Sequence, residues 1–95
     1  MILLSYAPEA LADLERLVAF LIERDPQSAQ AAARVIVDAI RILEVHPFVG
    51  RRLRGSLREL VISFGRTGYV AVYRVTGRGV EILAIRHQRE AGTIA

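Results

Sequence analysis

The chain has 95 residues, of which 53% are hydrophobic and 24% are charged, a balance typical of one small folded domain and not of a disordered chain. It contains no cysteine, which excludes disulfides and cysteine-based metal or redox sites and favours a reducing, cytoplasmic environment. The two histidines, His46 and His87, are far apart and belong to no spaced cluster of ligands, so we expect neither a metal nor another cofactor. We expect residues 1–95 to form a single domain.

Charge is distributed unevenly between the two halves of the chain. Residues 1–50 hold four arginines and seven acidic residues, a net charge of −3, whereas residues 51–95 hold nine arginines and three acidic residues, a net charge of +6. The 13 lysine or arginine residues are all arginine, whose planar guanidinium pairs well with carboxylates and phosphates. The basic half therefore favours an acidic partner, either a nucleic acid or an acidic peptide, although codon bias explains the absence of lysine equally well.

The first half of the chain predicts a strand followed by two helices. Met1–Tyr6 contains three consecutive large aliphatic residues and predicts a short strand. Pro8 suits the first position of a helix, and Asp25-Pro26 ends that helix and caps a second one, which we expect to run to about Val45. Because the connection is so short, the two helices form an antiparallel hairpin. The apolar residues at helical spacing, which we expect to be buried, are Leu11, Leu14, Leu17, Val18, Leu21 and Ile22 on the first helix and Ala29, Ala32, Ala33, Ile36, Val37, Ile40 and Leu43 on the second.

The second half predicts a loop and three strands. His46–Gly55 contains one proline and two glycines around a basic cluster, and we expect it to be a loop. Ser56–Phe64 alternates in hydrophobicity, Tyr69–Val75 is rich in aromatic and β-branched residues, and Val80–His87 forms the last strand. The turns between them are short, so the strands are antiparallel neighbours. The order βααβββ predicts an α+β fold, with the helical hairpin packed on a mainly antiparallel four-stranded sheet.

One catalytic function has candidate residues in this chain, a metal-free ribonuclease. It requires a base, an acid and cations that hold the phosphate. Glu59 and His87 fit the first two roles, and Arg74 or Arg86 fits the third. An antiparallel meander, however, groups Glu59 with Arg74 and leaves His87 at the opposite edge. The alternative, which we favour, is that Glu59 pairs with a cross-strand arginine and that His87 caps the sheet.

Further residues are candidates for binding a partner. The cluster Arg51, Arg52 and Arg54 suits phosphates or an acidic peptide, and a solvated loop is the equal alternative. Tyr69 and Tyr73 share strand parity, and we favour core packing for both, with partner contact as the alternative. The residues that we expect to bind a target or an antitoxin are Arg51, Arg52, Arg54, Arg58, Tyr73, Arg74, Arg86, His87 and Arg89.

Short motifs along the whole chain form a recognisable series. They are Asp13-Leu14, Pro47-Phe48-Val49-Gly50-Arg51, Arg58-Glu59-Leu60, Tyr69–Val75 and Ile85-Arg86-His87-Gln88-Arg89-Glu90-Ala91-Gly92. Each motif is weak alone, but in this order and spacing they resemble the ParE/RelE superfamily of toxins, and the ParE branch in particular.

The resemblance implies the toxin of a type II toxin–antitoxin system. ParE-like toxins poison DNA gyrase, and RelE-like relatives cleave messenger RNA on the ribosome. Both kinds are silenced by a cognate antitoxin whose C-terminal part wraps the toxin. RelE-like nucleases rely on lysines and arginines around the sheet and on an aromatic residue or histidine near the C-terminus. Here there is no lysine and no tyrosine after His87. The resemblance therefore favours a non-catalytic gyrase inhibitor over a ribosome-dependent endoribonuclease, with an inactive remnant as a third alternative.

The composition also bears on the antitoxin. A mean hydropathy of +0.32 is high for so small a domain and indicates apolar surface that another chain covers, with an alanine-rich core as the alternative. Together with the basic second half, this predicts an acidic, amphipathic antitoxin in a hetero-oligomer with this chain. We expect no membrane association, since the apolar run Leu17–Ile22 is too short to span a bilayer.

Overall fold

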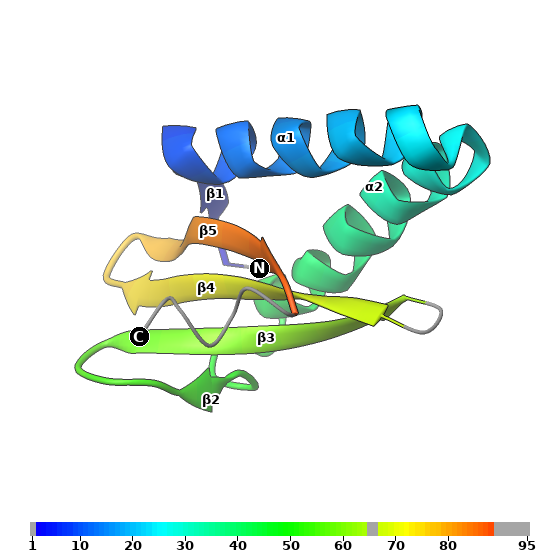
Figure 1. The fold of residues 1–95 in the computed structure, drawn as a ribbon. Helices are drawn as coiled ribbons and strands as arrows, with labels where there is room; N and C mark the ends of the chain where they lie inside the picture. The colour runs from blue at the N-terminus through cyan, green and yellow to red at the C-terminus, as the bar shows by residue number, and fades with distance from the viewer. Residues whose placement is uncertain (1, 65–66, 89–95) are drawn as a thin grey trace.

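Two helices lie over one side of a five-stranded sheet (Figure 1), so the predicted α+β class is confirmed. The computed structural model describes residues 2–64 and 67–88. Its elements in chain order are β1 (Leu4–Tyr6), α1 (Pro8–Arg24), α2 (Pro26–Ile40), the 3-10 helix η1 (Arg41–Glu44), β2 (Arg51–Arg52), β3 (Leu57–Phe64), β4 (Thr67–Thr76) and β5 (Gly79–His87).

The centre of the sheet is the antiparallel meander that the sequence predicts. Strand β3 pairs with β4 and β4 pairs with β5, and the second turn is closed by the pair Thr76 and Gly79. Gly79 has a φ of +140°, a backbone conformation that favours glycine. The expected turn at residues 65–68 falls partly outside the described residues.

The edges of the sheet differ from the prediction, because there are five strands and one pairing is parallel. The strand order is β1-β5-β4-β3-β2, with β1 parallel to β5 and Leu4 opposite Val80. Strand β2 lies inside the stretch expected to be a loop and places Arg51 opposite Glu59. Two consecutive arginines show no hydrophobic alternation, so the sequence around them does not predict a strand. Their pairing with β3 follows from the path of the loop.

The predicted boundary between the helices is confirmed. The carboxylate of Asp25 accepts hydrogen bonds from the hydroxyl of Ser28 at 2.6 Å and from its backbone N–H at 3.3 Å. These hydrogen bonds lower the pKa of Asp25, and the one from the Ser28 hydroxyl has the larger effect. Pro26 occupies the first position of α2, where no N–H is needed. Helix α2 ends at Ile40, and η1 continues the chain to Glu44, one residue short of the predicted end.

The core lies between the helices and the sheet face that they cover. Fully buried residues come from every layer, including Ile36 and Ile40 of α2 and Ile82 of β5. Tyr69 and Tyr73 of β4 are also in this core, which confirms the favoured interpretation of both tyrosines. Helix α1 lies along β5 and α2 descends obliquely toward β3, so the two helices together extend across the sheet from β5 to β3 (Figure 1).

Three residues of the predicted buried helical faces are instead exposed. Leu11, Ile22 and Val37 have relative exposures of 47%, 54% and 36%. The apolar arc of each helix is wider than the surface that the sheet covers, so its margins reach solvent. The expectation of burial was wrong for these residues, and their exposure leaves apolar surface on the helices.

The buried position of Ile40 leads to a first prediction. Ile40→Ala should lower the free energy of unfolding by about 2–5 kcal/mol, because it removes a fully buried side chain and leaves a cavity. The same substitution at the exposed Ile22 is the matched control and should cost less than about 1 kcal/mol. Denaturant unfolding followed by circular dichroism measures both, and similar losses at the two positions would contradict the observed packing.

Candidate functional site

The loop before β2 is fixed to the sheet by one phenolic hydroxyl. The Oη of Tyr73 accepts a hydrogen bond from the Gly50 N–H at 2.9 Å and donates one to the Pro47 carbonyl at 2.8 Å. A Cβ at position 50 would lie 2.5 Å from this oxygen, so the close approach requires glycine. Tyr73 is fully buried beneath the loop. This buried position differs from the exposed one expected of a residue that binds a partner. Tyr73 instead positions the loop.

Arg58 holds the same loop from the side. Its guanidinium donates to the carbonyls of Phe48 at 3.1 Å and Gly50 at 2.9 Å, and it lies 5.1 Å from the centre of the Phe48 ring. One nitrogen of this guanidinium, Nη1, is therefore bound to the loop, and the role of Arg58 in binding a partner stays a prediction. The loop presents the side chains of Phe48 and Val49 to solvent, with relative exposures of 63% and 53%.

The basic cluster continues from this loop into β2. Arg51 forms an ion pair with Glu59, which is only 8% exposed. The favoured prediction was that Glu59 pairs with an arginine on a neighbouring strand and is not catalytic, and Arg51 is such an arginine. The strand that carries Arg51, β2, was not predicted from the sequence. Arg52 and Arg54 are exposed and extend the positive surface beside the loop.

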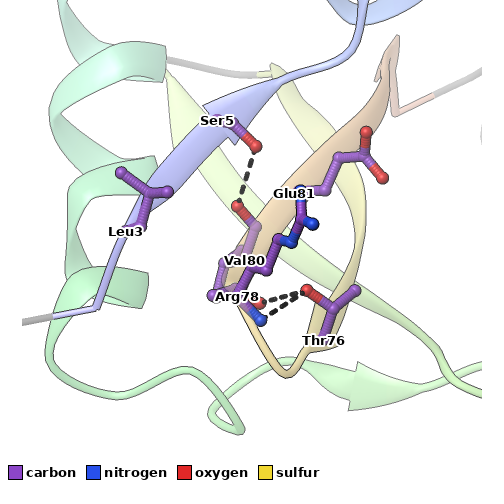
Figure 2. Close-up of a pocket in the computed structure, with 7 residues that line it drawn as sticks. Leu3, Ser5, Thr76, Arg78, Val80 and Glu81 are labelled. Carbon is purple, nitrogen blue, oxygen red and sulfur yellow. Dashed lines mark hydrogen bonds between the residues drawn. The ribbon is translucent and has the colours of Figure 1, made fainter.

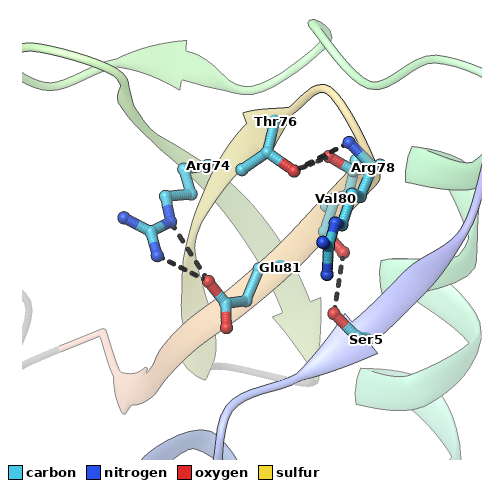
Figure 3. A network of polar contacts seen from close by, with 7 residues as sticks. Ser5, Arg74, Thr76, Arg78, Val80 and Glu81 are labelled. Atoms are coloured by element: carbon cyan, nitrogen blue, oxygen red, sulfur yellow. Dashed lines mark hydrogen bonds and ion pairs between the residues drawn. The ribbon is translucent and has the colours of Figure 1, made fainter.

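Arg74 has a specific partner across the β4–β5 hairpin. Its Nε and Nη2 both donate to one carboxylate oxygen of Glu81, at 3.1 and 2.9 Å (Figure 3). The symmetry of the turn at residues 76–79 places these two residues opposite each other, so this pair was open to prediction from the sequence. Glu81 offsets much of the charge that Arg74 was expected to offer to a phosphate.

An open pocket of about 300 Å³ lies at this end of the sheet, between β1 and the hairpin turn (Figure 2). Its lining residues are Leu3, Ser5, Thr76, Arg78, Gly79, Val80 and Glu81. The hydroxyl of Ser5 donates to the Val80 carbonyl, and that of Thr76 donates to the Gly79 carbonyl, both at 3.4 Å. These hydroxyls hold the strand pairing and the turn. The pocket includes none of the residues considered for a nuclease.

The other end of β5 is anchored to helix α1. The carboxylate of Asp13 accepts the backbone N–H of Ile85 at 3.0 Å and forms an ion pair with Arg86. The ring of His87 meets that of Tyr69 edge to face, with 5.6 Å between their centres. His87 thus lies beside Tyr69, as the meander predicts. Burial raises the pKa of Tyr69 above its ordinary value.

The candidate nuclease residues do not converge. Glu59 lies opposite Val72 of β4, whereas His87 lies opposite Tyr69, three residues along that strand and on its other side. Standard strand spacing and rise per residue put the two Cα atoms about 14 Å apart. Arg74 lies toward the Glu59 end of the sheet, and Arg86 lies toward the His87 end. The predicted separation of Glu59 from His87 is confirmed.

Residues 2–64 and 67–88 contain neither a cluster of metal ligands nor a membrane-spanning helix. In these ranges no group of three or more histidine or acidic side chains is arranged to hold a metal ion. No helix within them is long and apolar enough to cross a membrane. Arg89, which we expect to bind a partner, lies outside the described residues.

A family model for the ParE toxin of type II toxin–antitoxin systems, parDE, matches residues 4–92. The chain belongs to the ParE toxin family. It is 41% identical over 83 residues to "Toxin RelE3" of Caulobacter vibrioides (strain ATCC 19089 / CIP 103742 / CB 15), covering 87% of this chain and 90% of that toxin. It is 36% identical over 78 residues to "Toxin RelE1" of the same strain, covering 82% and 84%.

A solved structure shows the same fold. The match is to "Chromosomal ParDE TA system from P. aeruginosa", with a TM-score of 0.76 and 25% identity, covering 92% of this chain and 96% of that one. The ParE/RelE assignment from the sequence motifs is therefore confirmed. The chain is a toxin of a type II toxin–antitoxin system, and such a system includes an antitoxin protein as partner. Its relatives carry both ParE and RelE names, so membership leaves the target open.

Two parts of this surface, Asp13 and the pair Phe48 and Val49, had no role predicted from the sequence. Asp13 belongs to a recognised motif, but its contact with β5 depends on how α1 crosses the sheet. Phe48 and Val49 also lie in a recognised motif, and their exposure depends on the hydrogen bonds beneath them. The signal for both was the motif itself, which names the residues but not the contacts that they make.

The Tyr73 hydroxyl gives a second prediction. Tyr73→Phe should lower the free energy of unfolding by about 1–3 kcal/mol, since it leaves the Gly50 N–H and the Pro47 carbonyl without this partner. Amide hydrogen exchange at Gly50 should accelerate. Tyr6 supplies the matched control, because its buried hydroxyl has no hydrogen-bond partner among the described residues. Tyr6→Phe should leave stability unchanged or raise it, and equal losses in the two variants would refute the positioning role.

Proposed function

We propose that this toxin acts by binding and inhibiting DNA gyrase and carries out no chemical step itself. Gyrase inhibition is the activity that the resemblance to ParE implies, and both the family model and the solved relative carry ParE-type names. The observation that carries the proposal is the separation of Glu59 from His87 across β4. General acid–base catalysis requires both groups within hydrogen-bond reach of the same substrate.

The charge distribution supports a binding mechanism. Arg52 and Arg54 are exposed beside a fixed loop, and arginine is among the residues that dominate binding energy at protein interfaces. An inhibitor that acts by binding spreads its potency over such contacts and needs no proton-transfer group. The ion pairs of Glu59 with Arg51 and of Arg74 with Glu81 suit an inhibitor of this kind. They fix side chains of the binding surface in place and take no part in proton transfer.

Ribosome-dependent cleavage of messenger RNA is the second candidate function. Both Caulobacter relatives carry RelE names, at 41% and 36% identity, whereas the ParDE structure is 25% identical. A nuclease must activate the 2′-hydroxyl and protonate the leaving oxygen, so its activity depends on one or two particular side chains. The activity of a binding inhibitor does not. This difference makes the two candidates separable by mutation.

The antitoxin is expected to neutralise the toxin by covering its basic and apolar surfaces. The exposed Leu11, Phe20 and Ile22 give α1 an apolar margin, and the basic cluster of residues 51–54 attracts acidic side chains. An acidic, amphipathic C-terminal segment of the antitoxin that wraps these surfaces would bury on the order of 1,000–3,000 Å² as it folds.

The third prediction separates inhibitor from nuclease. Purified toxin should block supercoiling by gyrase and should leave ribosome-bound message intact. His87→Ala and Glu59→Gln should keep most of the growth arrest seen without antitoxin, whereas Arg52→Ala and Arg54→Ala should reduce it in steps. Loss of a general acid or base would lower a nuclease rate by about 10²–10⁴-fold. If either His87→Ala or Glu59→Gln abolishes toxicity in a folded protein, the ribonuclease becomes the better explanation.

The fourth prediction concerns the antitoxin. Its affinity should fall as salt rises, because screening weakens attraction between exposed charges. The double variant Arg52→Ala/Arg54→Ala should bind less tightly and with a shallower salt dependence. Leu11→Ser is the control, since it removes apolar contact and should weaken binding without changing the salt slope. Titration by calorimetry at several salt concentrations measures both, and an affinity that does not change with salt would count against this view.

A further inference from the structure

Large apolar side chains gather at the surface around the loop before β2. Five of the exposed ones that the described residues include fall within positions 42–53: Ile42, Val45, Phe48, Val49 and Leu53. A concentration of exposed aliphatic and aromatic side chains within one short stretch of the chain is typical of a place where another molecule binds.

The backbone beneath these side chains is fixed. Successive turns join the N–H of Val45 to the Ile42 carbonyl at 3.1 Å and the N–H of Val49 to the His46 carbonyl at 3.2 Å. Tyr73 and Arg58 then hold residues 47–50 through their backbone groups. The tip formed by Phe48 and Val49 is therefore already ordered before binding, and little further conformational entropy is lost when a partner takes it.

The surroundings of the tip are positively charged. Residues 46–58 contain four arginines and no acidic residue, and Arg52 and Arg54 are exposed there. An apolar centre with a basic rim complements an apolar depression bordered by carboxylates. A nucleic acid would use the arginines through its phosphates but would leave aliphatic side chains such as Val49 without a partner.

We propose that Phe48 and Val49 are the tip by which this toxin docks into an acidic, apolar-centred depression on its folded protein target. The inference rests on the proposed function, in which that target is gyrase. A short, fixed tip suits a preformed site on a folded protein. An antitoxin segment that folds as it wraps the toxin spreads its contacts over a much larger area, so it depends little on any two side chains.

The test compares the double variant Phe48→Ser/Val49→Ser with the control Leu3→Ser/Val61→Ser, which alters two exposed apolar residues that lie outside the loop and outside α1. The concentration of toxin that half-inhibits gyrase supercoiling should rise at least tenfold for the tip variant and less than twofold for the control. Affinity of the tip variant for the antitoxin should stay within about threefold of wild type, as expected for contacts outside the few that dominate an interface. Circular dichroism verifies folding, and Val49→Asp, a change at one exposed position, serves if the double variant does not fold.

Three outcomes would overturn the docking tip. The first is unchanged gyrase inhibition by the folded tip variant, and the second is a greater loss of antitoxin affinity than of gyrase inhibition. The third is that the tip variant loses binding to a duplex DNA probe instead of binding to gyrase. Failure of the wild-type toxin to inhibit gyrase would instead refute the proposed target. Growth arrest then decides the tip separately. If the control variant still arrests growth and the tip variant does not, the tip contacts a different protein, and if the tip variant remains toxic, both proposals fail.

Discussion

The hydroxyl of Tyr73 links the hydrophobic core of this protein to its basic surface. The ring is packed among apolar side chains, where an unpaired polar atom would be costly, and the loop at residues 47–50 supplies both hydrogen-bond partners. Gly50 permits the approach because no other residue fits against the ring. The position of the loop is thus determined by the same packing that stabilises the core.

The rest of the candidate site is organised around this contact. Once the loop is fixed, Arg51 comes opposite Glu59, and the two-residue strand β2 forms beside β3. Through its Nη1, Arg58 donates hydrogen bonds to two of the loop carbonyls. Several arginines that look equivalent in the sequence therefore have different functions, because some build the surface while Arg52 and Arg54 are exposed on it.

The parts of the fold that could be predicted are those with local causes. Asp25-Pro26 contains both the end of one helix and the cap of the next, and short turns require the antiparallel meander. The same meander separates Glu59 from His87, so even the failure of the nuclease site to assemble was foreseeable. The pairing of β1 with β5, the existence of β2 and the exposure of Leu11 and Ile22 depend on how distant elements pack, which helical or strand periodicity does not encode.

The contact between Asp13 and β5 bears on how free toxin avoids assembling with itself. Strand β1 pairs only with residues 80–82, so the remainder of β5 would present backbone donors to a neighbouring chain. The carboxylate of Asp13 takes the N–H of Ile85, and α1 lies along that side. At the opposite edge, β2 is two residues long and consists of arginines, whose like charges repel a second copy. The part of β5 beyond β1 and the short edge strand β2 are therefore protected against pairing with a second chain, which matters most when no antitoxin covers the protein.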